Sequence, residues 1–147
     1  MVKDEELQIG YLLKRAQAVL HSRMDEVLRP LGLSVPQYVC LHFLQQEPGI
    51  SAAELARSAF VTRQSMNALL QGLQDRGLVE RPARPASGRA LPAAVTAVGM
   101  AALAEAEAAV DGVEQRMLSR LGESGAAALG RGLTQCTAAL EDGEQAG

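Results

Sequence analysis

The sequence predicts a mainly α-helical fold with one small β-ribbon, and three observations support this fold class. Hydrophobic residues make up 48% of the 147 residues but aromatic residues only 3%, so the core must consist of Leu, Val and Ala, as in Ala-rich helical proteins. Apolar residues recur at spacings of three and four over several long stretches, which is the period of a helix. Only the stretch after Gly77 changes to short extended runs. The length is that of a single domain.

The first expected helix covers residues 5–29, where apolar side chains form one stripe along the helix. The stripe contains Leu13, Ala16, Leu20, Met24 and Val27. Pro30 and Gly32 end this helix. Ser34 then stands at an N-cap position with a proline in the first turn, which predicts a second helix to about Gln46.

Two shorter helices are expected next, separated by a tight turn. Ser51 and Glu54 have the spacing of a capping box, which predicts a helix from Ser51 to about Ser58. Thr62 has the residue type of another N-cap, and its helix is expected to run to about Arg76, because Gly77 is a helix-ending residue. On that helix the apolar side consists of Met66, Leu69, Leu70 and Leu73.

A β-ribbon follows, and a long helical region closes the chain. The runs 78–81 and 91–95 are expected to pair as strands around a turn-rich tip, with Pro92 restricting the second strand to an edge. Thr96 is the expected cap of a helix over residues 97–121. Glycines in the segment 122–125 are expected to break the helix before a last helix over residues 126–141.

The chain contains no pattern of a membrane, secreted, metal-binding or catalytic protein. No apolar run approaches the roughly 18 residues of a membrane span, and the acidic N-terminus is unlike a signal peptide, so a soluble cytoplasmic protein is expected. Cys40 and Cys136 lack metal-ligand spacing and are expected to be buried structural thiols. We therefore expect no metal, no cofactor and no enzyme activity.

Charge is distributed unevenly along the chain. The net charge is −1 over residues 1–50, +3 over residues 51–99 and −5 over residues 100–147. A basic middle between acidic ends favours contact of the middle with an anion. A solvated face of mixed charge is the alternative interpretation.

Two short helices, a tight turn and a ribbon follow one another in the order of a winged helix-turn-helix, whose helix fits the major groove of DNA. The sequence also resembles the MarR family of bacterial transcriptional regulators. The matching segments are 51–57 (SAAELAR), 60–65 (FVTRQS), 69–73 (LLQGL), 75–81 (DRGLVER), Arg89 and 95–99 (VTAVG). This resemblance implies one domain over residues 1–147, with a DNA-binding lobe at 34–99 and helical dimerisation arms at 1–33 and 100–147. Ser87 departs from the family, which often has an acidic residue there.

The helix after Thr62 carries the residue types that read double-stranded DNA. Amide side chains suit adenine, arginine suits guanine, and hydroxyl groups at a helix N-terminus suit phosphate. The alternative is a solvated polar face. The predicted DNA-binding residues are Thr62, Arg63, Gln64, Ser65, Asn67 and Gln71 on the helix and Arg84 and Arg89 on the wing.

A second group of side chains is the candidate effector site. Tyr11 and Arg15 lie four residues apart, as do Tyr38 and His42, so each pair shares a helix face, and His21 lies further along the first helix. Family members often bind small anionic aromatic compounds between the arms and the lobe, and a guanidinium suits a carboxylate. In the alternative interpretation, Arg15 is a surface charge and Tyr38 a core ring.

The function favoured by these patterns is a homodimeric repressor of a near-palindromic operator, released by a small aromatic or phenolic acid. Apolar side chains in the arms would be covered by a second copy. These side chains are Leu13, Leu20, Val110, Met117, Leu133 and Leu140. Two alternatives are a winged-helix protein-interaction module that binds no DNA and a regulator that senses redox conditions through cysteine.

Overall fold

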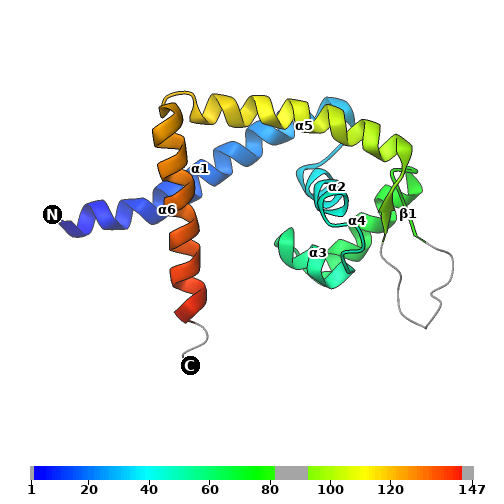
Figure 1. The fold of residues 1–147 in the computed structure, drawn as a ribbon, viewed down its shortest axis with the longest axis horizontal. Coiled ribbons are helices and arrows are strands. Elements are labelled where there is room, and N and C mark those ends of the chain that lie inside the picture. Colours follow the sequence, from blue (N-terminus) through cyan, green and yellow to red (C-terminus); the bar gives the residue numbers. More distant parts are fainter. Residues whose placement is uncertain (1, 82–92, 144–147) are drawn as a thin grey trace. The chain divides into compact units, whose positions relative to one another are not determined.

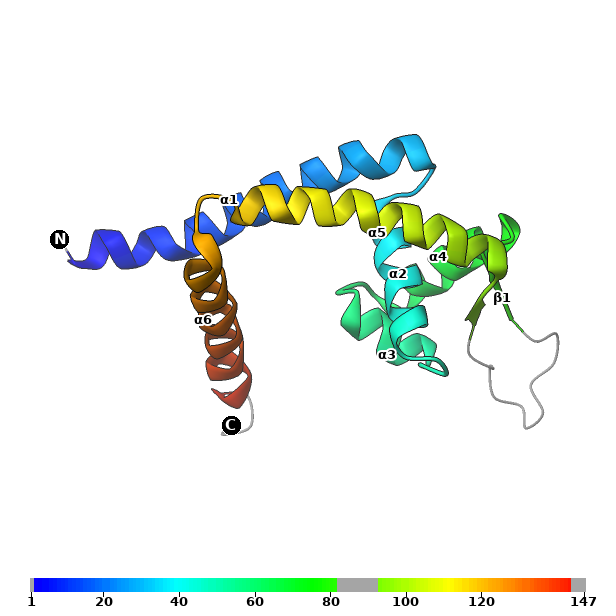
Figure 2. The same ribbon diagram turned by 45° about the horizontal axis from the view of Figure 1, so that its top comes forward.

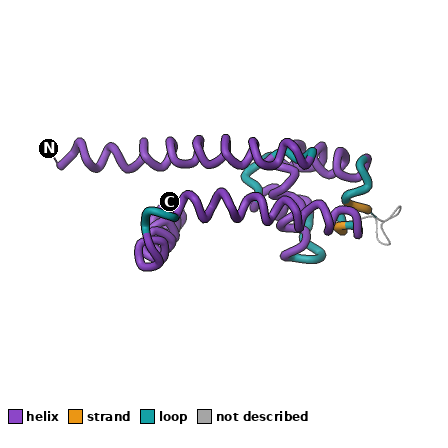
Figure 3. The backbone as a smooth tube through the Cα atoms, turned by 90° about the horizontal axis from the view of Figure 1, so that it is seen from above, coloured by secondary structure: helices purple, strands orange, loops and turns teal. Residues whose placement is uncertain are grey.

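The computed structural model describes residues 2–81 and 93–143, with side chains from residue 8 onward. Helices make up most of these residues, and the two strands form one small antiparallel ribbon (Figures 1 and 3). The mainly α-helical fold class with a β-ribbon is therefore confirmed. The backbone contacts divide the chain into two compact units, residues 1–111 and residues 112–147.

The first two helices begin and end close to the predicted residues. Helix α1 spans Val2–Leu28 and continues into a short 3-10 helix, η1 (Arg29–Leu31), which ends at Gly32 with a φ of 75°. Helix α2 spans Val35–Gln46, as predicted. The Ser34 hydroxyl oxygen accepts a hydrogen bond from the Gln37 amide at 3.2 Å, and the Gln37 side chain accepts one from the Ser34 amide at 3.0 Å. A complete capping box therefore begins α2.

Helices α3 (Ala52–Ser58) and α4 (Arg63–Asp75) form the expected pair around a tight turn. Ser51 caps α3 by accepting a hydrogen bond from the Glu54 amide at 3.1 Å. This is half of the capping box expected there, because the only hydrogen bond between the two residues runs from that amide to the Ser51 hydroxyl. Helix α4 ends before Gly77, whose φ of 73° gives the left-handed conformation that glycine adopts without strain.

The ribbon begins directly after α4. Strand β1 (Val79–Glu80) and strand β2 (Ala94–Val95) form the antiparallel ribbon (Figure 2). In its register, Val79 lies opposite Val95. Both strands are shorter than predicted within the described residues. The expected tip and the start of the second run, residues 82–92, lie outside the described residues.

Thr96 caps helix α5 (Ala97–Leu118), as predicted. The Thr96 hydroxyl oxygen accepts a hydrogen bond from the Gly99 amide at 3.0 Å and donates one to the Gly77 carbonyl at 2.6 Å, so it joins α5 to the end of α4. Helix α6 (Gly122–Asp142) begins four residues earlier than predicted. Of the two glycines in the expected break, Gly122 and Gly125, only Gly122 has a left-handed φ, of 70°. One glycine therefore suffices for the break, and the next three residues are helical.

The core of the first unit is aliphatic, as the composition predicted. Its fully buried side chains come from the end of α1, from α2, α3, α4, β1 and α5, and the largest are Leu28, Leu41, Leu55, Met66, Leu70, Leu73 and Leu103. Val110 is also buried in this core, so the expectation that it supplies a dimer face is wrong for this residue. In the described part of the chain, no helix is long and apolar enough to cross a membrane.

Candidate nucleic-acid interface and effector site

The N-terminus of α4 is built by Thr62. Its hydroxyl oxygen accepts a hydrogen bond from the Ser65 amide at 3.0 Å and donates one to the Ser65 hydroxyl at 2.9 Å. Thr62 thus satisfies one of the free amides of the first turn. The remaining amides and the positive end of the helix dipole stay available to an anion, and both hydroxyl groups are exposed beside them.

Helix α4 has one buried side and one exposed polar side. Met66, Leu70 and Leu73 are buried and Leu69 is half-buried, so the predicted apolar side is confirmed. The polar side is thereby fixed toward solvent. All six helix residues of the predicted DNA interface are exposed, namely Thr62, Arg63, Gln64, Ser65, Asn67 and Gln71. Of these, Gln71 donates a hydrogen bond to Asp75 at 2.9 Å, which holds its amide along the helix. Arg84 and Arg89 lie outside the described residues.

The turn before α4 contains a residue that sequence analysis missed. Phe60 has a φ of 57° and its side chain is 95% exposed. A signal was present in the sequence, because two helices joined by a tight turn usually have glycine at this position and none occurs between Ser51 and Gly72.

Tyr38 and His42, two of the predicted effector-site residues, lie close together on α2. Their ring centroids are 6.0 Å apart. Tyr38 is buried, whereas His42 is half-buried with its Nδ1 atom 3.4 Å from a carboxylate oxygen of Glu107 on α5. Glu107 was not predicted, and no local sequence pattern marks it, because it lies 65 residues from His42. A protonated His42 can form an ion pair with this carboxylate.

The other three predicted effector-site residues lie on α1. Tyr11, Arg15 and His21 are all exposed in the single chain, which leaves the Arg15 guanidinium open to an anion. The five predicted residues therefore come from two helices, with buried Tyr38 and half-buried His42 on α2 and three exposed side chains on α1. Their role in ligand binding stays a prediction.

Known proteins share this sequence and fold. A model of the MarR family matches residues 31–90. The HTH-type transcriptional repressor Rv2887 of Mycobacterium tuberculosis is 50% identical over 117 residues, which are 80% of this chain and 84% of that repressor. The chain belongs to the MarR family.

Two crystal structures of Rv2887 match the fold of this MarR-family chain. The complex with salicylic acid has a TM-score of 0.72 at 48% identity, and the match covers 86% of this chain and 94% of Rv2887. The complex with DNA has a TM-score of 0.73 at 45% identity, covering 86% and 95%. The predictions of a winged helix-turn-helix fold and of a transcriptional regulator are thereby confirmed.

The two cysteines of this MarR-family protein have opposite environments. Cys40 is buried on α2, and its Sγ atom lies 3.7 Å from the sulfur of Met66. Burial raises the pKa of the Cys40 thiol to about 12, although the charge of Arg81 acts in the other direction. Cys136 is exposed in the single chain, so its expected burial is wrong there. The reason is that α6 has no buried residue.

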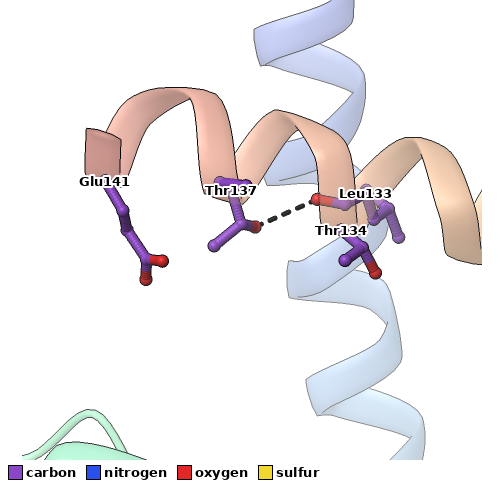
Figure 4. A pocket seen from close by; sticks show the side chains of 5 residues that line it. Leu133, Thr134, Thr137 and Glu141 are labelled. Atoms are coloured by element: carbon purple, nitrogen blue, oxygen red, sulfur yellow. Dashed lines mark hydrogen bonds between the residues drawn. The ribbon is translucent and has the colours of Figure 1, made fainter. Parts of the chain in front are cut away.

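A shallow hollow of this MarR-family protein is formed by α6 alone. Its lining comes from one helix, and Figure 4 shows the side chains of Leu133, Thr134, Thr137 and Glu141 spaced along it. The Thr137 hydroxyl donates a hydrogen bond to the Leu133 carbonyl at 3.0 Å, inside the helix itself. The hollow is therefore the exposed surface of α6. Among the described residues, no group of three metal-ligating side chains occurs.

Proposed function

We propose that the protein is a homodimeric repressor that binds a near-palindromic DNA operator and is released from it by a small aromatic acid. It acts as a regulator without catalytic activity, in the cytoplasm, where bacterial DNA lies. The observation that carries the proposal is the exposed polar side of α4. Thr62 caps this helix, and three buried apolar residues on its other side hold the polar side toward solvent. Rv2887 has been solved with DNA and with salicylic acid, which supports both parts.

The proposed DNA contacts divide into two kinds. Thr62 and Ser65 would bind a phosphate at the N-terminus of α4, while Arg63, Gln64 and Asn67 would read base edges in the major groove. Gln71 would contact the groove further along the helix after exchanging its hydrogen bond with Asp75. Arg84 and Arg89 would reach DNA from the wing, beside the groove that α4 occupies.

The proposed domain organisation places DNA binding in residues 34–99 and dimerisation in residues 1–33 and 100–147. The arms support this proposal because both carry large exposed apolar side chains. These side chains are Ile9, Leu12, Leu13, Met117, Leu129, Leu133 and Leu140. A second copy that covers them would also place two α4 helices on one duplex, as a two-fold operator requires.

Selection of duplexes from a random-sequence library with the full-length protein tests this function. We expect enrichment of a near-palindrome whose half-sites are about 10–10.5 base pairs apart, or a multiple of this spacing. Arg63→Ala should abolish the enrichment, whereas Arg120→Ala removes an exposed charge far from α4 in the sequence and should not. A library that shows no enrichment with the wild-type protein would contradict DNA-specific repression and favour a protein-interaction module.

A further inference from the structure

The turn between α3 and α4 holds Phe60 in an unusual backbone conformation. Helix α3 ends with the Phe60 amide donating to the Arg57 carbonyl at 3.3 Å and the Val61 amide donating to the Ala56 carbonyl at 3.0 Å. This pattern wraps the last turn of a helix and requires a left-handed residue, which Phe60 supplies with a φ of 57°. Glycine is the usual residue there because a Cβ atom disfavours this conformation.

The side chain of Phe60 is also unusual, because it is 95% exposed while its neighbour Val61 packs against the core. An aromatic ring in water gains nothing from its large apolar surface. Phe60 therefore combines an unfavourable backbone conformation with an unfavourable exposure. Within the described residues, the ring is not buried, so burial offsets neither disadvantage. A surface of another molecule that covers the ring would offset both.

The surroundings of Phe60 favour DNA as that surface. The ring lies two residues before Thr62, the cap of α4, and the only charged residues between Leu55 and Gln74 are Arg57 and Arg63. Both arginines are exposed. An acidic or neutral protein surface would match this charge less well than a polyanion does.

We propose that the Phe60 ring is part of the DNA interface, where it packs against the apolar surface of the duplex beside the groove entered by α4. That surface consists of deoxyribose carbons and the methyl groups of thymine. This inference rests on the proposed function, because it assigns Phe60 to the same interface. It adds an apolar contact to an interface otherwise made of hydroxyl, amide and guanidinium groups.

Phe60→Gly tests the proposal because affinity and stability should change in different directions. Glycine removes the ring and relieves the backbone conformation, so the melting temperature should equal that of the wild type or exceed it by up to about 4 °C. The affinity for a duplex selected with the wild-type protein should fall by about tenfold or more. Val98→Ala removes another exposed apolar side chain and should leave the affinity unchanged.

Phe60→Ala separates the ring from the flexibility of glycine. Alanine lacks the ring but keeps the Cβ atom, so it should lose as much affinity as Phe60→Gly. If wild-type protein binds the duplex and both variants bind it equally well, the assignment of Phe60 is overturned while the proposed function stands. If the wild-type protein selects no duplex, the proposed function itself fails. An affinity loss confined to Phe60→Gly would also overturn the assignment, since it would reflect turn flexibility.

Replacing thymidine by deoxyuridine in the selected duplex identifies the covered surface, because deoxyuridine lacks the methyl group. If the ring packs against a thymine methyl group, the replacement should lower the DNA affinity of the wild-type protein but not that of Phe60→Ala. A ring on deoxyribose predicts equal effects of the replacement on both proteins. Both results support the proposal, provided that Phe60→Ala lowers the affinity.

Discussion

Asn67 and Gln64 are exposed amides three residues apart on α4, so they lie on one face of the helix. An amide presents a donor and an acceptor side by side, which matches the N6 and N7 atoms of adenine. The neighbouring Met66 is fully buried and fixes the rotation of the helix about its axis. The amides therefore face outward without a change in the fold, and their effect on DNA binding should depend on sequence.

Asn67→Ala should cost about 1–3 kcal/mol of binding free energy at one position of each half-site, because only the contacted base pair loses its partner. Competition with duplexes substituted one position at a time measures this. Gln74→Ala removes an exposed amide at the far end of α4 and is the matched control. A uniform loss across all duplexes would show that Asn67 does not read a base.

Cys40 should be unreactive in the folded protein, because the thiolate is the nucleophile and burial raises the pKa of this thiol to about 12. In a Cys136→Ser variant, Cys40 is the only thiol. Iodoacetamide at mildly alkaline pH should add no group to this variant when folded and one group after unfolding in guanidinium chloride, as measured by mass spectrometry. Complete labelling of the folded variant would reopen the redox alternative.

Gly99 lies where α5 closely approaches Leu78, the residue before β1, and Val95 in β2, so this approach positions the ribbon relative to α5. A Cβ atom at Gly99 would lie 2.0 Å from the Leu78 carbonyl oxygen and 2.8 Å from a methyl group of Val95. These contacts involve the backbone that starts the ribbon, so the element as a whole must shift. The packing of the described ribbon against α5 thus requires a residue without a Cβ atom at position 99.

Gly99→Ala should therefore lower the free energy of unfolding by about 1–3 kcal/mol or more, through overpacking against the backbone. Gly112→Ala is the matched control on the same helix, because no atom lies within 4 Å of the added Cβ. It should raise stability by about 0.5–1 kcal/mol through helix propensity. Urea unfolding measures the free energy of unfolding of both variants. Equal values for the two would contradict the close contact between Gly99 and Leu78.

The elements that the sequence predicted well are those with local chemical signals. Ser34, Thr62 and Thr96 are predictable as N-caps because each hydroxyl-bearing residue directly precedes a stretch of helical apolar spacing, where its oxygen can accept a hydrogen bond from a first-turn amide. The start of α6 was missed because Gly125 looks like Gly122, and only the backbone distinguishes them. Contacts between distant segments, such as His42 with Glu107, leave no local trace at all. Burial of Val110 and exposure of Cys136 depend on such contacts, so periodicity alone could not assign them.

In the described part of the whole molecule, most of the large apolar side chains that are exposed lie on the arms. On α6, Leu129, Leu133 and Leu140 recur at helical spacing, and Leu140 is 79% exposed. A monomer would leave this face in water. We therefore expect Leu133→Glu to dissociate the dimer, while Gln135→Glu on the opposite side of α6 adds the same charge without doing so. Sedimentation at micromolar concentration measures this, and a wild-type protein that sediments as a folded monomer would refute dimerisation.

Release from DNA is expected to involve Arg15, whose guanidinium offers two parallel donors to a carboxylate. A ligand shifts the protein away from DNA only if it prefers the conformation that does not fit the operator. Arg15→Ala should keep DNA affinity but lose the response to added salicylate, and Lys14→Ala, the neighbouring cation, should keep both. Fluorescence anisotropy with labelled duplex measures the response. A wild-type response in Arg15→Ala would remove this residue from the effector site.

The salt dependence of DNA affinity tests the central claim most directly. A dimer that binds through two α4 helices and two wings neutralises several phosphates and releases their counterions. For about six phosphate contacts, the logarithm of the association constant should fall linearly with the logarithm of salt concentration, with a slope of about −5. A slope near zero, or no binding at low salt to a duplex taken from the selection, would contradict the assignment of this chain as a DNA-binding repressor.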